Sequence, residues 1–175
     1  SIGHHNKLER IKSIHSFNSL GMLYSRTTAL MGMKPLEHEY KLMGMAPYSP
    51  DFLTEKSYNI FKKYIKLDKT GLSFENITGV YGNQLIKKLH KDLYLIRFDA
   101  VCAGLQKITE ELALQWILNW VKKTGISDIT LAGGVFMNVK LNMLINETKE
   151  ISSVFFTPSC GDESIALGAS LYHYV

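Results

Sequence analysis

Two segments in the last third of the chain each have the pattern of a strand, a loop and a helix, and they constrain the fold more than any other feature. The first covers residues 128–138 (DITLAGGVFMN) and the second residues 154–164 (VFFTPSCGDES). If the two strands are parallel neighbours, both loops leave the same edge of one sheet, where open α/β sheets bind ligands. The sequence therefore predicts an α/β fold with a ligand site at this edge.

The longest helical pattern covers residues 98–123, and Gly125 follows it where helices commonly end. Its apolar side chains stay near one face over about seven turns. They are Val101, Leu105, Ile108, Leu112, Trp116 and Trp120. We expect this helix to span the core.

Shorter patterns predict the elements around this helix. Helices are expected over residues 19–33, with a cap from residues 16–19, over 37–45, and over 52–66, with Asp51 as the cap. A strand is expected over residues 7–14, paired with a segment upstream of the chain, and a small hairpin at 72–74 within a surface excursion over 67–82. Residues 1–175 are predicted to form a single domain, helix-rich with a few strands.

Composition excludes several classes of protein. The 175 residues are 46% hydrophobic and carry a net charge of +4 from scattered lysines, so no nucleic-acid surface is predicted. The two cysteines make neither a disulfide framework nor a zinc motif, and the six histidines form no ligand set. No stretch approaches the roughly 18 apolar residues of a membrane span, and no signal peptide is recognised. We expect a cytoplasmic protein without membrane contact.

The loop over residues 132–138 (AGGVFMN) follows the first strand of the C-terminal third. Two glycines let the backbone approach a ligand closely, and the start of the next helix presents unpaired N–H groups. This pattern suits a phosphate or nucleotide, although a tight turn without a ligand has the same composition. Asn138 either hydrogen-bonds a base or sugar or only favours the start of the helix.

Two further segments have both structural and functional interpretations. Asp162 is either a helix cap or an oxygen ligand to a divalent cation. The segment over residues 37–47 (EHEYKLMGMAP) is interpreted as a structural helix with Glu37 and Lys41 paired. Gly44 within it costs about 1 kcal/mol against alanine, which indicates close packing or a ligand approach.

Five segments in register resemble the carbamoyltransferases of the nodulation and antibiotic-biosynthesis type. They are residues 19–25 (SLGMLYS), 39–48 (EYKLMGMAPY), 98–106 (FDAVCAGLQ), 131–138 (LAGGVFMN) and 158–168 (PSCGDESIALG). The resemblance implies a ribonuclease-H-like fold of the sugar-kinase and actin superfamily, closest to the domain shared with tRNA threonylcarbamoyl transferases. It also implies ATP, carbamoyl phosphate and an iron-type divalent cation: a separate C-terminal domain makes carbamoyl-adenylate, and this type of domain transfers the carbamoyl group to a small-molecule acceptor.

The resemblance assigns roles to single residues but identifies no catalytic base. The residues expected at the adenylate are Gly133, Gly134, Val135 and Asn138. Asp162 is expected to be a metal ligand, and the same cleft is expected to be lined by Glu39, Lys41 and Gly44. The chain departs from the family pattern at Glu163 and Ser164, which replace small residues.

Two parts of the family pattern are expected to lie outside this sequence. The metal-binding HHxxH segment and a DGxGE-like loop belong upstream, and the adenylate-forming domain belongs downstream. We therefore expect a partial carbamoyltransferase domain that works with the missing domains of its own protein and is inactive, or nearly so, alone. The alternatives are a non-catalytic nucleotide-binding module of the same fold and a sugar or acetate kinase.

Overall fold

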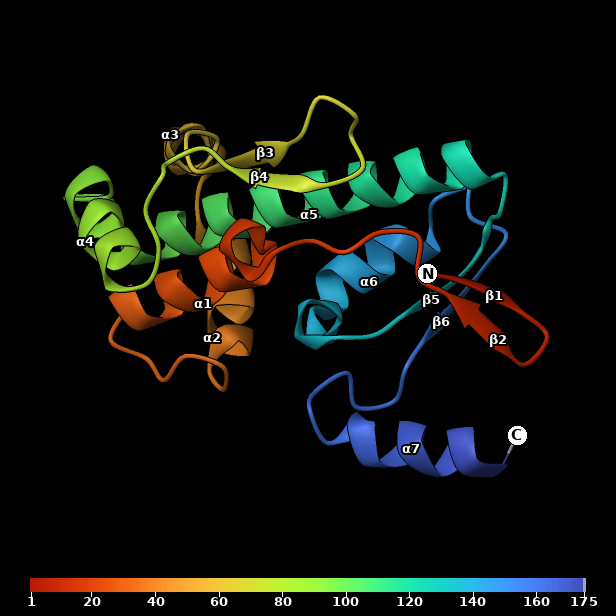
Figure 1. Ribbon diagram of the computed structural model, residues 1–175. Helices are drawn as coiled ribbons and strands as arrows, with labels where there is room; N and C mark the ends of the chain where they lie inside the picture. The colour runs from red at the N-terminus through yellow and green to blue at the C-terminus, as the bar shows by residue number, and fades with distance from the viewer. Residues whose placement is uncertain (175) are drawn as a thin grey trace.

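The computed structural model describes residues 1–174, which form a mixed α/β structure rich in helix, with three two-stranded sheets. The long helix α5 (Phe98–Thr124) runs across the molecule, and the other elements lie around it (Figure 1). The remaining helices are α1 (Leu20–Leu30), α2 (Glu39–Met45), α3 (Asp51–Phe61), α4 (Asn83–Asp92), α6 (Val139–Asn146) and α7 (Ser164–Tyr174). Short 3-10 helices are η1 (Ser16–Asn18), η2 (Ala46–Tyr48) and η3 (Gly134–Met137).

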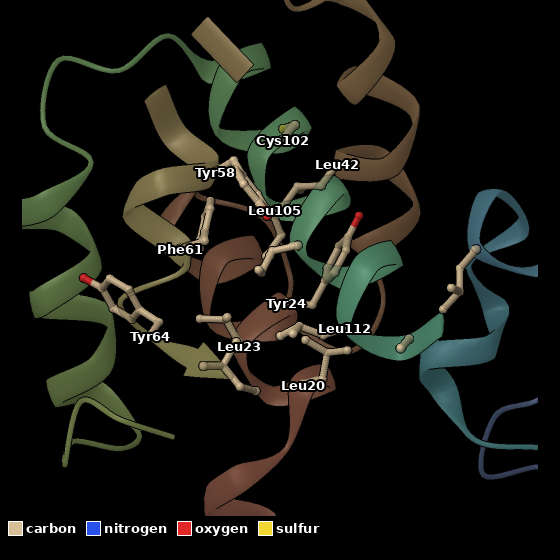
Figure 2. Packing of buried hydrophobic residues seen from close by; sticks show 14 of the residues in the cluster. Leu20, Leu23, Tyr24, Leu42, Tyr58, Phe61, Tyr64, Cys102, Leu105 and Leu112 are labelled. Atoms are coloured by element: carbon tan, nitrogen blue, oxygen red, sulfur yellow. The ribbon is translucent and has the colours of Figure 1, made fainter. Parts of the chain in front are cut away.

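Helix α5 confirms the prediction from apolar spacing. Val101, Leu105, Ile108 and Leu112 are buried, and the helix ends at Gly125, whose φ of 71° is the left-handed conformation that glycine adopts readily. Side chains of α1, α2 and α3 converge on Leu105 and its neighbours in this helix (Figure 2). The core is therefore a helical layer built around α5.

Helix α3 crosses α5 at very short range because Gly104 has no side chain. A Cβ placed on Gly104 lies 2.6 Å from the backbone nitrogen of Tyr58 and 2.8 Å from the carbonyl carbon of Ser57. The Ser57 hydroxyl donates a hydrogen bond to the carbonyl of Ala100 at 2.5 Å. This crossing fixes α3 on the core.

The N-terminal strand differs from its prediction. Strand β2 (Lys7–Glu9) ends before residue 14 and pairs antiparallel with β1 (Ile2–His4), so its partner lies within the chain and not upstream. The predicted helix over 19–33 is confirmed in α1, and the Ser19 hydroxyl accepts a hydrogen bond from the Met22 N–H as its cap.

Helix α3 is shorter than predicted. It ends at Phe61, because Ile65 belongs to β3 (Ile65–Leu67), which pairs antiparallel with β4 (Phe74–Asn76). A hairpin is therefore present, but its strands are residues 65–67 and 74–76, whereas the prediction placed it at 72–74. The prediction of Asp51 as a cap is wrong: Asp51 lies in the first turn, Pro50 precedes it, and no side chain caps the helix. Helix α4 is not among the predicted elements.

The C-terminal prediction of parallel neighbouring strands is confirmed. Strand β5 (Asp128–Leu131) pairs parallel with β6 (Ser153–Phe156), with Leu131 opposite Phe156, so both following loops leave one edge. One face of this sheet packs on the core through Ile129 and Val154. Helix α7, drawn in dark blue, lies apart from the bundle around α5 and has no buried residue (Figure 1).

Within residues 1–174, no helix has the length and apolar character needed to cross a bilayer.

Candidate functional site

A cavity of about 360 Å³ opens where the loop after β5 meets the starts of α1 and α2. Cavities of this size accept small ligands. Its lining combines three segments that are far apart in sequence, together with Thr109 of α5: Ser19–Ser25 without Leu23, then Leu36, Glu37, Glu39, Tyr40 and Met43, then Gly134, Val135, Met137 and Asn138. The wall is mainly apolar. The charged side chains among these residues are the carboxylates of Glu37 and Glu39, and no lysine or arginine lines the cavity.

The loop after β5 is held in place by its glycines and by α1. Gly133 has φ 102° and ψ 154°, a conformation that residues with a Cβ rarely adopt. Gly134 then begins η3. Val135 lies against Gly21 of α1, where an added Cβ would come within 2.9 Å of the Val135 Cγ2 atom. The missing side chain of Gly21 therefore brings the start of α1 and this loop together in one cavity wall.

Beneath the cavity, a hydrogen-bonded network joins three elements. The Tyr24 hydroxyl donates to Gln106 Oε1 at 3.1 Å, and Gln106 Nε2 donates to Asn138 Oδ1 at 3.0 Å. Asn138 Nδ2 returns a bond to Gln106 Oε1 at 2.8 Å, and Gln106 Nε2 also donates to Glu110 at 2.7 Å. Burial raises the pKa of Tyr24 well above its usual value, with smaller contributions from Cys102, Glu110 and Glu39. Tyr24 is therefore a neutral phenol that donates a hydrogen bond.

Asn138 uses its amide within the protein. Besides its bonds to Gln106, its Oδ1 accepts from the Leu141 N–H at 3.1 Å, so it caps α6. Of the two interpretations of Asn138, the structure shows the role at the start of the helix. Its side chain lines the cavity but has its polar atoms already paired.

The comparison with known proteins identifies the family. Residues 2–171 match the model described as carbamoyltransferase N-terminus. The chain belongs to this family. The match covers every segment on which the resemblance depends, from the start of α1 to the start of α7.

Three relatives show how much of such proteins the carbamoyltransferase region represents. The uncharacterized protein MJ1051 of Methanocaldococcus jannaschii is 35% identical over 98% of this chain, which is 33% of the relative. Nodulation protein NolO of Bradyrhizobium diazoefficiens is 28% identical over 98% of this chain and 31% of its own length. Nodulation protein NolNO of Sinorhizobium fredii is 28% identical over 98% of this chain and 25% of its own length. The chain therefore spans about a third or less of each relative.

The cavity of this carbamoyltransferase domain takes in half of the predicted site residues. Glu39, Gly134, Val135 and Asn138 line it, and Glu39 accepts a hydrogen bond from the Leu36 N–H at 2.7 Å. Gly133 precedes Gly134 in the loop but is not part of the lining. Lys41 and Gly44 lie on α2 but outside the lining. The predicted pairing of Glu37 with Lys41 is wrong: Glu37 precedes α2 and pairs with Lys34.

Asp162 lies in the loop before α7 and is exposed, outside the cavity lining. Among residues 1–174 its carboxylate accepts no hydrogen bond, so its interpretation as a helix cap is wrong. The neighbouring carboxylate does have a partner: a hydrogen bond from the Ser159 hydroxyl lowers the pKa of Glu163. The loop after β6 therefore starts at the predicted edge of the sheet, but Asp162 lies outside the cavity that Gly134 lines.

Three residues of the site escape prediction from the sequence. Tyr24 and Ser25 lie in the segment over residues 19–25 that carries the resemblance, but no role was predicted for either. Gln106 does give one: it is a polar residue, only 5% exposed, on the buried face of α5 next to Leu105. A buried amide needs hydrogen-bond partners, and that rule could have located the network.

The surroundings of Gly44 test whether close packing explains a glycine at this position of α2. Close packing is wrong, because no atom lies within 4 Å of a Cβ added there. Gly44→Ala is therefore expected to stabilise the domain by about 0.5–1 kcal/mol, since alanine is favoured over glycine within a helix. Urea unfolding measures this change. A loss of stability would contradict this expectation, because it would mean that the added methyl group meets an atom close to Gly44.

Proposed function

We propose that the cavity binds the adenosine part of a carbamoyl-adenylate, formed from ATP and carbamoyl phosphate, and that the domain serves transfer of the carbamoyl group to an acceptor. The acceptor oxygen or nitrogen attacks the carbamoyl carbon and loses its proton, the bond from that carbon to the phosphate oxygen breaks, and AMP leaves. The match of residues 2–171 to the carbamoyltransferase N-terminus supports a role in carbamoyl transfer. A sugar or other natural product is the proposed acceptor.

The observation that carries this proposal is the combination of the glycine loop with an apolar cavity that has no cationic lining. Gly134 leaves backbone open beside the cavity, and Leu20 and Gly21 begin α1, where the first N–H groups have no partner within the helix. These groups suit a single phosphate. The apolar wall suits a base, and closing it around the ligand excludes water that would hydrolyse a carbamoyl-adenylate.

The same charge pattern disfavours the kinase alternative. A kinase must hold a triphosphate, whose several negative charges are normally met by lysine, arginine or Mg²⁺. Here Glu37 and Glu39 lie at the cavity and would repel such a group. An acylated adenylate has one negative charge and is repelled least. Phosphorylation of an acceptor in the absence of carbamoyl phosphate would support the kinase.

We also propose that the helices and the β5–β6 sheet are part of a ribonuclease-H-like domain, and that other domains of the same protein make the adenylate. The described residues fit an iron-type centre poorly. Within residues 1–174 no group of three His, Cys, Asp or Glu side chains is arranged to hold a metal ion. One exposed carboxylate is too little for such a centre, so Asp162 stays a predicted ligand.

Gly134→Ala tests the adenylate site. The added methyl group meets no protein atom within 4 Å, so stability is expected to stay within about 0.5 kcal/mol. Affinity for AMP is expected to fall about tenfold or more, because the methyl group occupies space that the ligand needs. Isothermal titration calorimetry with AMP measures the affinity.

Gly168→Ala is the matched control, since it is the same change with the same open surroundings, placed on α7 away from the cavity. It is expected to leave AMP affinity unchanged. Absence of AMP binding by the unaltered protein would contradict the proposed function. Equal affinities for the unaltered protein and Gly134→Ala would show that AMP binds elsewhere.

A further inference from the structure

Ser25 is a buried side chain whose hydroxyl has no partner in the described structure. It lines the cavity and is 2% exposed. The hydroxyls around it are paired: Thr27 donates to the Leu23 carbonyl at 2.9 Å and Thr28 to the Tyr24 carbonyl at 3.1 Å. Across residues 1–174, no such bond is made by Ser25. The Ser25 oxygen is not among the fully enclosed side-chain atoms that lack a partner, so it is reached from the cavity, where a ligand can bind it.

The other polar groups deep in the cavity are already used. The Thr109 hydroxyl donates to the Leu105 carbonyl at 2.8 Å, and the Tyr24 hydroxyl donates to Gln106. Ser19 caps α1, and the oxygen and the nitrogen of the Asn138 amide each have a partner within the protein. Among the buried residues of the cavity lining, Ser25 therefore has the one hydroxyl that makes no hydrogen bond within residues 1–174.

The apolar lining of the cavity favours a flat aromatic ring. Three methionines, Met22, Met43 and Met137, line the cavity with Val135. Thioether sulfur makes favourable contacts with aromatic rings, and methionine adapts to their shape. The phosphate of a nucleotide, in contrast, suits the unpaired N–H groups at the start of α1. One hydroxyl among apolar side chains can bind the polar edge of a ring without binding a charged group.

From this arrangement we infer that Ser25 is a specificity-determining residue that hydrogen-bonds the edge of the purine base, with the methionines against the ring. The inference rests on the proposed binding of an adenylate in the same cavity. It assigns the edge of the base to Ser25 and the phosphate to the backbone of Gly134 and the first residues of α1.

The test compares AMP with ribose 5-phosphate, which has the same phosphate and sugar but no base. Ser25→Ala is expected to weaken AMP binding about tenfold, as expected for the loss of one hydrogen bond of about 1.4 kcal/mol. Affinity for ribose 5-phosphate is expected to stay unchanged. Because the hydroxyl has no partner in the protein, the midpoint of thermal unfolding is expected to be unchanged or slightly raised.

Thr28→Val is the matched control on the same helix, since it removes a buried hydroxyl that has a protein partner. It is expected to lower the unfolding midpoint by about 2–4 °C and to leave the ratio of the two affinities unchanged. The inference is overturned if Ser25→Ala weakens both ligands equally, if it weakens neither, or if it lowers the midpoint as Thr28→Val does. If the unaltered protein binds neither ligand, both the proposed function and this inference fail. If Ser25→Ala leaves AMP binding unchanged, only this inference fails.

Discussion

Replacing Gly104 by alanine is expected to destabilise the domain by about 3 kcal/mol or more. The new methyl group would lie 2.6 Å from the backbone nitrogen of Tyr58, and backbone cannot rotate away as a flexible side chain can. Helix α3 must therefore move off α5. Overpacking of a core typically costs about 1–3 kcal/mol, and a clash with backbone belongs at or above the upper end. Urea unfolding followed by circular dichroism measures the loss.

Gly44→Ala is the matched control for this change. It introduces the same methyl group into a helix of the same domain, but with open space around it. The two variants are therefore expected to change stability in opposite directions, although helix propensity favours alanine in both. If Gly104→Ala were as stable as the unaltered protein, α3 and α5 could not cross as closely as the structure has them.

The replacement Gln106→Leu is expected to destabilise the domain by about 2–4 kcal/mol. Leucine has a similar volume, so the main change is the loss of hydrogen bonds with Tyr24, Asn138 and Glu110. A buried polar group left without a partner costs about 1–3 kcal/mol, and this variant leaves more than one. AMP affinity is expected to fall as well, because the Asn138 side chain no longer has the partner that links the loop to α5.

Gln115→Leu provides the comparison on the same helix. Gln115 is exposed and bonds only Asn119, one turn further along α5. Exposed substitutions usually change stability by no more than about 0.5 kcal/mol. Similar losses for Gln106→Leu and Gln115→Leu would mean that the network contributes nothing beyond helix propensity, and would contradict its assignment as the support of the cavity.

Local patterns explain which predictions were confirmed. Helix α5 and the strands β5 and β6 have apolar side chains at spacings fixed by the geometry of a helix or a strand, and the glycine after α5 ends it through its own conformation. Where a local pattern competes with pairing elsewhere, the prediction failed. Ile65 continues the spacing of α3 but lies in a strand, because residues 65–67 pair with residues 74–76.

The candidate site depended more strongly on contacts between distant residues. Glycine spacing indicated the loop at Gly133 and Gly134 but could not show that Gly21 lets it lie against α1. The same limit applies to Asn138, whose two interpretations differ only in the partners of its amide. Those partners include Gln106, which is 32 residues away in sequence, and through it Tyr24, which is 82 residues from Gln106.

The sequence alone determined the long core helix and the two strand, loop and helix segments, because their side chains recur at fixed short spacings. Its resemblance to carbamoyltransferases came from five matching segments. Only the tertiary structure decided that the starts of α1 and α2 complete the cavity, that Ser25 is left unpaired within it, and that Asp162 lies outside it. Such contacts depend on how whole helices pack, and the packing is set by the summed shapes of many side chains, which no local pattern contains.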